Sequence, residues 1–86
     1  MFKIIFSKKF VDQYENLEDK IQIVALKKIE LFKSNTKHPS LNTHKLNGQL
    51  TGFFSFSIDM KYRIVFEYGD KNTVHFLKIG NHDIYK

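Results

Sequence analysis

Residues 53–80 read FFSFSIDMKYRIVFEYGDKNTVHFLKIG, and this stretch decides the fold. Its apolar side chains recur at every second position, the period of a strand with two unequal faces, first at Phe54, Phe56 and Ile58, then at Tyr62, Ile64, Phe66 and Tyr68. The short polar segments 59–61 and 69–72 predict turns, and residues 73–79 predict one further strand. The stretch therefore predicts a three-stranded antiparallel meander.

The residues before this stretch predict one short strand and two helices. Residues 2–6 have the composition of a strand, and Ser7 is a suitable N-cap for a helix that begins near Lys8. Helical spacing of apolar residues runs through the segments 10–17 and 21–33, with a break at Asn16 and Asp19: the first stripe is Phe10, Val11, Tyr14 and Leu17, the second Ile21, Val24, Ala25, Ile29 and Phe32. We expect an antiparallel helical hairpin.

The connection between helix and sheet, residues 34–43, holds the only Pro and no carboxylate, so it predicts an exposed loop. Together these segments predict an α+β fold with an N-terminal strand, a helical hairpin and an antiparallel β-meander. The helices should cover one face of the sheet, and the first strand could join the meander at an edge. The other face and the chain's end are then the expected working surface.

Composition restricts the functions that the chain can have. At 86 residues it has room for one hydrophobic core, so residues 1–86 are expected to form a single domain. The net charge of +5 suits RNA or an acidic protein as partner, or simply solubility. The absence of Cys excludes disulfides, thiolate metal sites and a Cys nucleophile. No segment has the length of a membrane span or a signal peptide core, so we expect a cytoplasmic protein with no membrane partner.

The remaining chemistry favours RNA. The four His have no metal-ligand spacing and the four Gly form no nucleotide-binding motif, so neither a metal nor a cofactor is expected. A basic, aromatic sheet that contains His suits a phosphodiester of single-stranded RNA, whose 2′-hydroxyl supplies the nucleophile. Cleavage then needs a proton acceptor, a cation for the charge on phosphorus and an acid for the leaving oxygen, tasks that suit His, Arg and Tyr.

Four segments together resemble the RelE/ParE toxin superfamily: His44-Lys45-Leu46-Asn47-Gly48, Gly52-Phe53-Phe54-Ser55, Tyr62-Arg63-Ile64-Val65-Phe66, and the ending Leu77-Lys78-Ile79-Gly80-Asn81-His82-Asp83-Ile84-Tyr85. The resemblance runs from about residue 41 to the C-terminus, and the helical pair before it agrees in order and size. It implies a RelE-like β-α-α-β-β-β fold, cleavage of mRNA in the ribosomal A site, and neutralisation by a small antitoxin. Operator DNA would be bound only through that antitoxin.

The resemblance also implies roles for individual residues. Arg63 stands where RNA-cleaving members place an Arg that contacts phosphate, although it could instead be a solvated residue paired with Glu67 or another carboxylate. His82 stands where YafQ-like and YoeB-like members carry a catalytic His, the alternative being a surface His at a strand end. Tyr85 is similar to the terminal aromatic that stacks on a base or assists proton transfer, or it could cap the core. His44 is similar to the His of the YafQ-like His-x-Leu segment.

Lys45, Lys61 and Lys86 could hold phosphates as point charges, although a solvated Lys is the commoner outcome. His38 and His75 are expected to be a loop residue and a structural residue. We expect Arg63 and His82 to project into one cationic hollow on the sheet face away from the helices.

Two departures from the family leave the general base open. Phe54 and Phe56 stand where RelE has paired Lys, and the acidic residue that YoeB-like members carry before the His-x-Leu segment is absent. His44 or Asp59 could take that role. A ParE-like, non-enzymatic inhibitor of DNA gyrase, or a detoxified relative that only binds an antitoxin, remains an alternative to the endonuclease.

Overall fold

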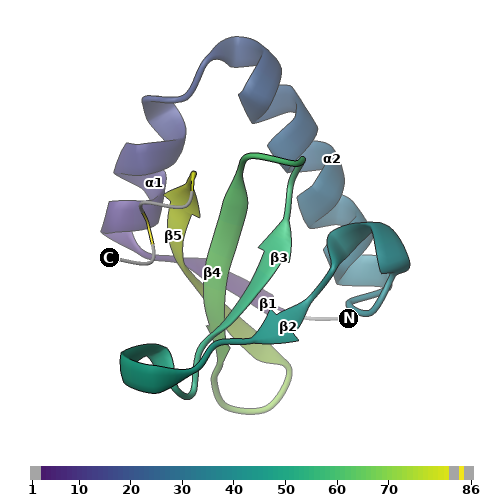
Figure 1. The fold of residues 1–86 in the computed structure, drawn as a ribbon, viewed down its shortest axis with the longest axis vertical. Helices are drawn as coiled ribbons and strands as arrows, with labels where there is room; N and C mark the ends of the chain where they lie inside the picture. Colours follow the sequence, from purple (N-terminus) through teal and green to yellow (C-terminus); the bar gives the residue numbers. More distant parts are fainter. Residues whose placement is uncertain (1–2, 82–83, 85–86) are drawn as a thin grey trace.

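The computed structural model describes residues 3–81 and residue 84 (Figure 1). In chain order the elements are β1 (Lys3–Phe6), α1 (Lys8–Glu15), α2 (Asp19–Ser34), the 3-10 turn η1 (Pro39–Leu41), β2 (His44–Lys45), the 3-10 turn η2 (Gly48–Leu50), β3 (Phe54–Ser57), β4 (Arg63–Tyr68) and β5 (Thr73–Gly80). The strands form one sheet in the order β1-β5-β4-β3-β2. β1 runs parallel to β5, and every other pair is antiparallel. The predicted α+β fold, its edge position for the first strand and its meander β3-β4-β5 are confirmed.

Helix α1 starts where the sequence predicts, and side chains at its N-cap and within it form hydrogen bonds with the backbone of β5. The Oγ of Ser7 accepts a hydrogen bond from Phe10 N at 3.0 Å, the N-cap arrangement that satisfies a free amide of the first turn. The same hydroxyl donates to the carbonyl of Leu77 at 3.0 Å, and Gln13 Oε1 accepts from Ile79 N at 3.0 Å. Because β1 pairs only with the first half of β5, these side chains satisfy backbone groups along the second half.

The hydrophobic core lies between the helices and one face of the sheet. Figure 1 shows the two helices joined at the top of the view and diverging beside the strands. Helix α2 contributes Ala25, Ile29 and Phe32, and α1 contributes Phe10, to a cluster whose sheet members include Phe56, Ile64, Phe66, Val74, Phe76 and Ile79. Phe32 is fully buried, with ring centroids 4.7 Å from Phe56 and 5.0 Å from Phe66. The helices therefore cover one sheet face, as predicted.

A β-bulge in β5 decides which of its side chains reach the core. Val65 is opposite Lys78, but the next residue of β4, Phe66, is opposite Phe76, so Leu77 is the extra residue. The insertion changes the phase of the alternation, and both Ile79 and Phe76 face the helices as a result. Lys78 consequently points to the other face.

The segment 34–43 differs from the predicted exposed loop. Its η1 turn carries Leu41 into the core, where the side chain is 0% exposed. A single apolar residue in a polar segment has no periodicity, so the pattern gave no sign of this burial. The two-residue strand β2 was not predicted either, because it is too short to show alternation. Among the described residues, no helix combines the length and apolar character needed to cross a membrane.

Candidate functional site

The sheet face opposite the helices, here called the open face, carries a row of polar side chains. His44 is the cross-strand partner of Ser55, Ser55 of Val65, and Val65 of Lys78. Cross-strand partners share a face and neighbours in one strand do not, and the residues that flank Val65 in β4 belong to the core beneath the helices. His44, Ser55 and Lys78 therefore project from the same face, the open face, in one row that crosses the sheet from β2 to β5.

The imidazole of His44 is oriented by two contacts. Its Nδ1 is 2.9 Å from the carbonyl oxygen of Asn42, and its Nε2 is 3.4 Å from Ser55 Oγ. A carbonyl only accepts hydrogen bonds, so this contact assigns the proton of the neutral ring to Nδ1 and leaves a lone pair on Nε2. Asn42 adopts the left-handed conformation, with φ at 49°, within the turn that makes this contact. His44 thus presents a proton-accepting nitrogen on the side of Ser55.

Arg63 occupies the next row of the open face. It lies between Ser57 and Gly80 in the register, about 7 Å along the strands from the His44 row, the repeat expected for side chains on one face. Its Nη1 donates to the carbonyl oxygens of Asp59 at 2.9 Å and Tyr62 at 3.4 Å. Within the described residues no carboxylate lies within ion-pair distance of Arg63. Among these residues its guanidinium contacts neutral groups, and the predicted alternative, a pair with Glu67 or another carboxylate, is not observed there.

A hollow of about 410 Å³ adjoins Arg63 at the β3–β4 turn, with Lys28 and Ser57 also in its lining. The carboxylate of Asp59, which also lines it, is engaged as a turn cap: Oδ1 accepts from Lys61 N at 2.8 Å and from Tyr62 N at 2.7 Å. These bonds tie the carboxylate to the backbone, so Asp59 is the weaker of the two candidate general bases.

The chain's last described residue, Ile84, is anchored on the open face. Its carbonyl accepts a hydrogen bond from Lys78 Nζ at 3.3 Å, and its side chain is only 8% exposed. A Cβ added to Gly80 would stand 2.5 Å from Ile84 Cγ2, so the two residues are in close contact because Gly80 lacks a side chain. Ile84 thus lies on the face that carries Arg63 and Lys78.

Gly80→Ala should release this anchor. The added methyl group cannot share the space of Ile84 Cγ2, and overpacking of this kind costs about 1–3 kcal/mol. The amide of Ile84 donates to Asn81 O at 3.1 Å, and we expect its hydrogen exchange to accelerate about tenfold or more in the variant. Exchange of the Phe66 amide in β4 serves as the internal control and should not change. Equal acceleration at both amides would mean that the whole fold, and not the anchor, is weakened.

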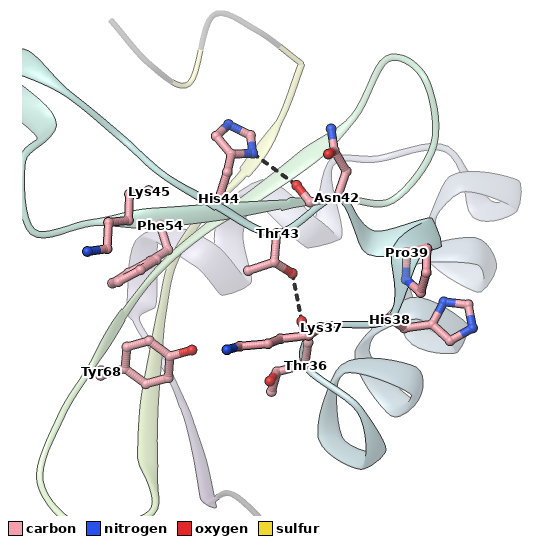
Figure 2. A pocket seen from close by; sticks show the side chains of 10 residues that line it. All are labelled: Thr36, Lys37, His38, Pro39, Asn42, Thr43, His44, Lys45, Phe54 and Tyr68. Atoms are coloured by element: carbon pink, nitrogen blue, oxygen red, sulfur yellow. Dashed lines mark hydrogen bonds between the residues drawn. The ribbon is translucent and has the colours of Figure 1, made fainter.

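Lys45 does not share the open face with its neighbour His44. It is opposite Phe54, whose ring stacks on the core residue Phe66 at 5.5 Å, so Lys45 points to the helix side of the sheet. There it lines a pocket of about 600 Å³ between β2 and the segment that follows α2 (Figure 2). A third hollow, about 200 Å³ between α1 and α2, is lined only by uncharged side chains.

The remaining candidates are dispersed or not described. Lys61 is in the β3–β4 turn, with Nζ 5.7 Å from the centre of the Tyr62 ring. His38 Nδ1 accepts from Ser40 N at 3.1 Å, and His75 Nδ1 is 3.8 Å from Glu67 Oε1, so both have local structural partners. No group of three His, Asp or Glu side chains suited to a metal occurs in the described part of the chain. His82, Tyr85 and Lys86 lie outside the described residues.

Ser55 and Lys78 are site residues that the sequence did not reveal. Ser55 is 0% exposed although it lies on the open face, and it supports the imidazole of His44. Its position follows from the alternation in β3, but its contact depends on β2, which was not predicted. The sequence shows Lys78 as the only Lys or Arg of β5. The face to which its side chain points depends on the bulge at Leu77.

Comparison with known proteins finds a family model and solved structures of similar fold. The family model described as the ParE toxin of the type II toxin–antitoxin system, parDE, matches residues 4–84. No curated protein matches the sequence. Among solved structures, the YoeB/ParE toxin from Agrobacterium tumefaciens superposes with a TM-score of 0.78 at 18% identity, over 94% of this chain and 99% of that one.

Two other structures have the same fold. YafQ from E. coli strain BL21(DE3) gives a TM-score of 0.75 at 16% identity, over 99% of this chain and 98% of the other. A YoeB-YefM complex from Staphylococcus aureus gives 0.74 at 21% identity, over 95% and 98% of the two chains. At these identities the likeness concerns the fold.

Proposed function

Since this chain belongs to the ParE toxin family of type II toxin–antitoxin systems, we propose that it is an endoribonuclease that cleaves mRNA in the ribosomal A site and so inhibits translation. One observation carries the proposal: the open face combines an imidazole with an oriented proton-accepting nitrogen, His44, and a cation without a carboxylate partner among the described residues, Arg63. Proton transfer and stabilisation of phosphate charge are the two tasks that RNA cleavage requires of a protein.

The proposed reaction uses the 2′-hydroxyl of the RNA as nucleophile. His44 Nε2 takes the hydroxyl proton, and the 2′ oxygen forms a bond to the adjacent phosphorus. Arg63, with Lys78 beside it on the open face, stabilises the charge that builds on the phosphate oxygens. His82 donates a proton to the 5′ oxygen as its bond to phosphorus breaks. The products are a 2′,3′-cyclic phosphate and a free 5′-hydroxyl, and no cofactor or metal takes part.

The C-terminal roles rest on the resemblance and on the anchor at Ile84. Because Gly80 and Ile84 lie on the open face on either side of His82 in the sequence, they support its assignment as the general acid there. Tyr85 is proposed to position the base or the reacting groups. Lys61 and Lys86 are proposed to hold phosphates of the same RNA strand.

Regulation by an antitoxin is part of the proposal. The YoeB structure from Staphylococcus aureus is a complex with YefM, and a chain of the same fold is expected to have a cognate antitoxin. We propose that an acidic or amphipathic segment of that antitoxin covers the basic sheet in the cytoplasm, and that operator DNA is bound only through it. Co-purification with the product of the neighbouring small reading frame would support this partner.

Primer extension tests the endonuclease directly. Expression of the chain should produce new breaks within the codons of translated mRNA, together with rapid loss of translation. The control is co-expression of the antitoxin, which should remove the breaks. Growth arrest with intact mRNA would contradict the proposal.

The second candidate function is that of a non-enzymatic DNA gyrase inhibitor, favoured by the match to the ParE family model. Inhibition of this kind would use the surface and the C-terminal tail rather than His44 and Arg63. It would produce DNA breaks and an SOS response instead of mRNA cleavage. A detoxified relative would produce neither effect and no growth defect.

A further inference from the structure

We propose that the pocket of about 600 Å³ on the helix side of β2, here called the edge pocket, binds one nucleotide of single-stranded RNA. Its lining includes Lys37, Thr43, Lys45, Phe54 and Tyr68 (Figure 2). The base would lie against the aromatic side of the pocket and the backbone phosphate between the two lysines. The choice of RNA over DNA rests on the proposed function, whereas the binding itself does not depend on cleavage.

An aromatic surface fixed by the core forms one side of the edge pocket. Phe54 stacks on the fully buried Phe66 with centroids 5.5 Å apart, and Tyr68 meets Phe54 edge-on at 5.0 Å. Tyr68 remains 47% exposed although it extends the core-facing side of β4. An exposed ring on a rigid support is the arrangement on which nucleic-acid bases stack, and such stacking tolerates any base.

The charge of the edge pocket suits a phosphate. Lys37 comes from the turn after α2 and Lys45 from β2. Figure 2 shows the Lys37 ammonium directed toward the Tyr68 hydroxyl and that of Lys45 beside Phe54. No carboxylate is present among the described residues that line the pocket, and none occurs in the sequence between Glu30 and Asp59. An acidic peptide would use the lysines but not the ring faces, so the combination favours a nucleotide.

The wall that carries Lys37 is held in place by a hydrogen bond and by a contact with the core. Thr43 Oγ1 donates to the carbonyl of Thr36 at 2.8 Å, which joins the two ends of the connection after α2. Leu41 anchors the same connection in the core. A pocket that is formed before binding loses less conformational entropy when a ligand enters.

The edge pocket lies on the other side of β2 from the open face. His44 and Lys45 are consecutive residues of the edge strand β2, and they point to opposite faces of the sheet. Because β2 is the last strand, an RNA strand on the open face can pass around its exposed edge and place a neighbouring nucleotide in the edge pocket. The edge pocket would then hold RNA in register with His44.

Fluorescence anisotropy with a fluorescein-labelled 2′-O-methyl oligouridine tests this proposal, since this RNA lacks the attacking hydroxyl and stays intact. Tyr68→Leu should raise Kd about tenfold, while Tyr68→Phe, which keeps the ring, should stay within about twofold. Lys37→Ala combined with Lys45→Ala should raise Kd about tenfold and lower the slope of log Kd against log salt concentration by about 0.7, the value for one phosphate of a single strand. The matched control, Lys8→Ala with Lys20→Ala, removes two exposed helix lysines and should change Kd about twofold or less.

A measurement on the unmodified protein removes any dependence on how the variants fold. Addition of the oligouridine should shift the Tyr68 ring proton resonances, and polyglutamate should not. Three results would overturn the proposal: unchanged ring resonances, equal loss of affinity in the control and pocket variants, or displacement of the RNA by polyglutamate at equal charge concentration.

These outcomes separate the edge pocket from the proposed enzyme activity. A protein that binds oligouridine through Tyr68 and the two lysines, but leaves ribosomal mRNA intact, would refute the endonuclease and keep the edge pocket. A protein that cleaves mRNA while its affinity depends on Arg63 and not on the edge-pocket residues would refute the edge pocket alone.

Discussion

Arg63→Ala should lower the rate of mRNA cleavage by about 10²–10³-fold, the usual effect of removing one group that stabilises charge in the transition state. The side chain projects from the open face of β4, and its guanidinium donates to two backbone carbonyls of the β3–β4 turn. Among the described residues no carboxylate pairs with it, so we expect its charge to be available to phosphate. Combined with His82→Ala, the substitution should abolish cleavage. The measurement is the initial rate of mRNA cleavage on purified ribosomes.

Two controls separate this effect from a general loss of charge or of folding. Arg63→Lys keeps the charge but not the planar fork, and it should recover only part of the rate. Lys71→Ala removes one exposed cation at the opposite end of β4, in the β4–β5 turn, and should leave the rate nearly unchanged. Circular dichroism should show the same fold in all variants. Undiminished toxicity in the double variant would refute the assignment of the active site.

Phe32→Ala should lower the free energy of unfolding by about 3–5 kcal/mol, the cost of deleting a large side chain from a packed core. The ring is 0% exposed and contacts the rings of Phe56, Phe66 and Phe76 with centroids 4.7, 5.0 and 5.6 Å away. A domain of this size has a total stability of about 4–13 kcal/mol, so the loss is a large part of it. Urea unfolding at equilibrium measures the change through a lower midpoint.

Leu26→Ala is the matched control for Phe32, since Leu26 is in the same helix but 53% exposed. Its replacement should cost about 0.5 kcal/mol or less. Equal destabilisation by the two substitutions would show that α2 does not pack on the sheet as described.

The strands β3 and β4 could be predicted from the sequence because side-chain direction along a strand follows from covalent geometry. The alternation at Phe56 and Ile64 therefore identified the core face correctly. Helix α1 could also be predicted from the sequence, because Ser7 as N-cap and the apolar stripe are local signals. The face to which Lys78 points could not be predicted, because the bulge at Leu77 depends on how β5 packs against both neighbouring strands.

The candidate site could be predicted only in part, for a similar reason. Arg63 and His44 could be singled out by resemblance, but the orientation of the imidazole depends on a left-handed Asn42 and on Ser55 across β2. Lys45 was predicted only as a possible point charge for phosphate, and the structure places it on the face of the sheet opposite to His44. Short strands and irregular turns take their geometry from tertiary contacts, which a single sequence does not display.

The most direct test maps the ends of mRNA on purified ribosomes incubated with the protein. The open face, with His44 and Arg63, predicts breaks within the A-site codon that leave 2′,3′-cyclic phosphate ends, and their loss in Arg63→Ala. Intact mRNA, together with inhibition of supercoiling by purified DNA gyrase at the same protein concentration, would contradict it.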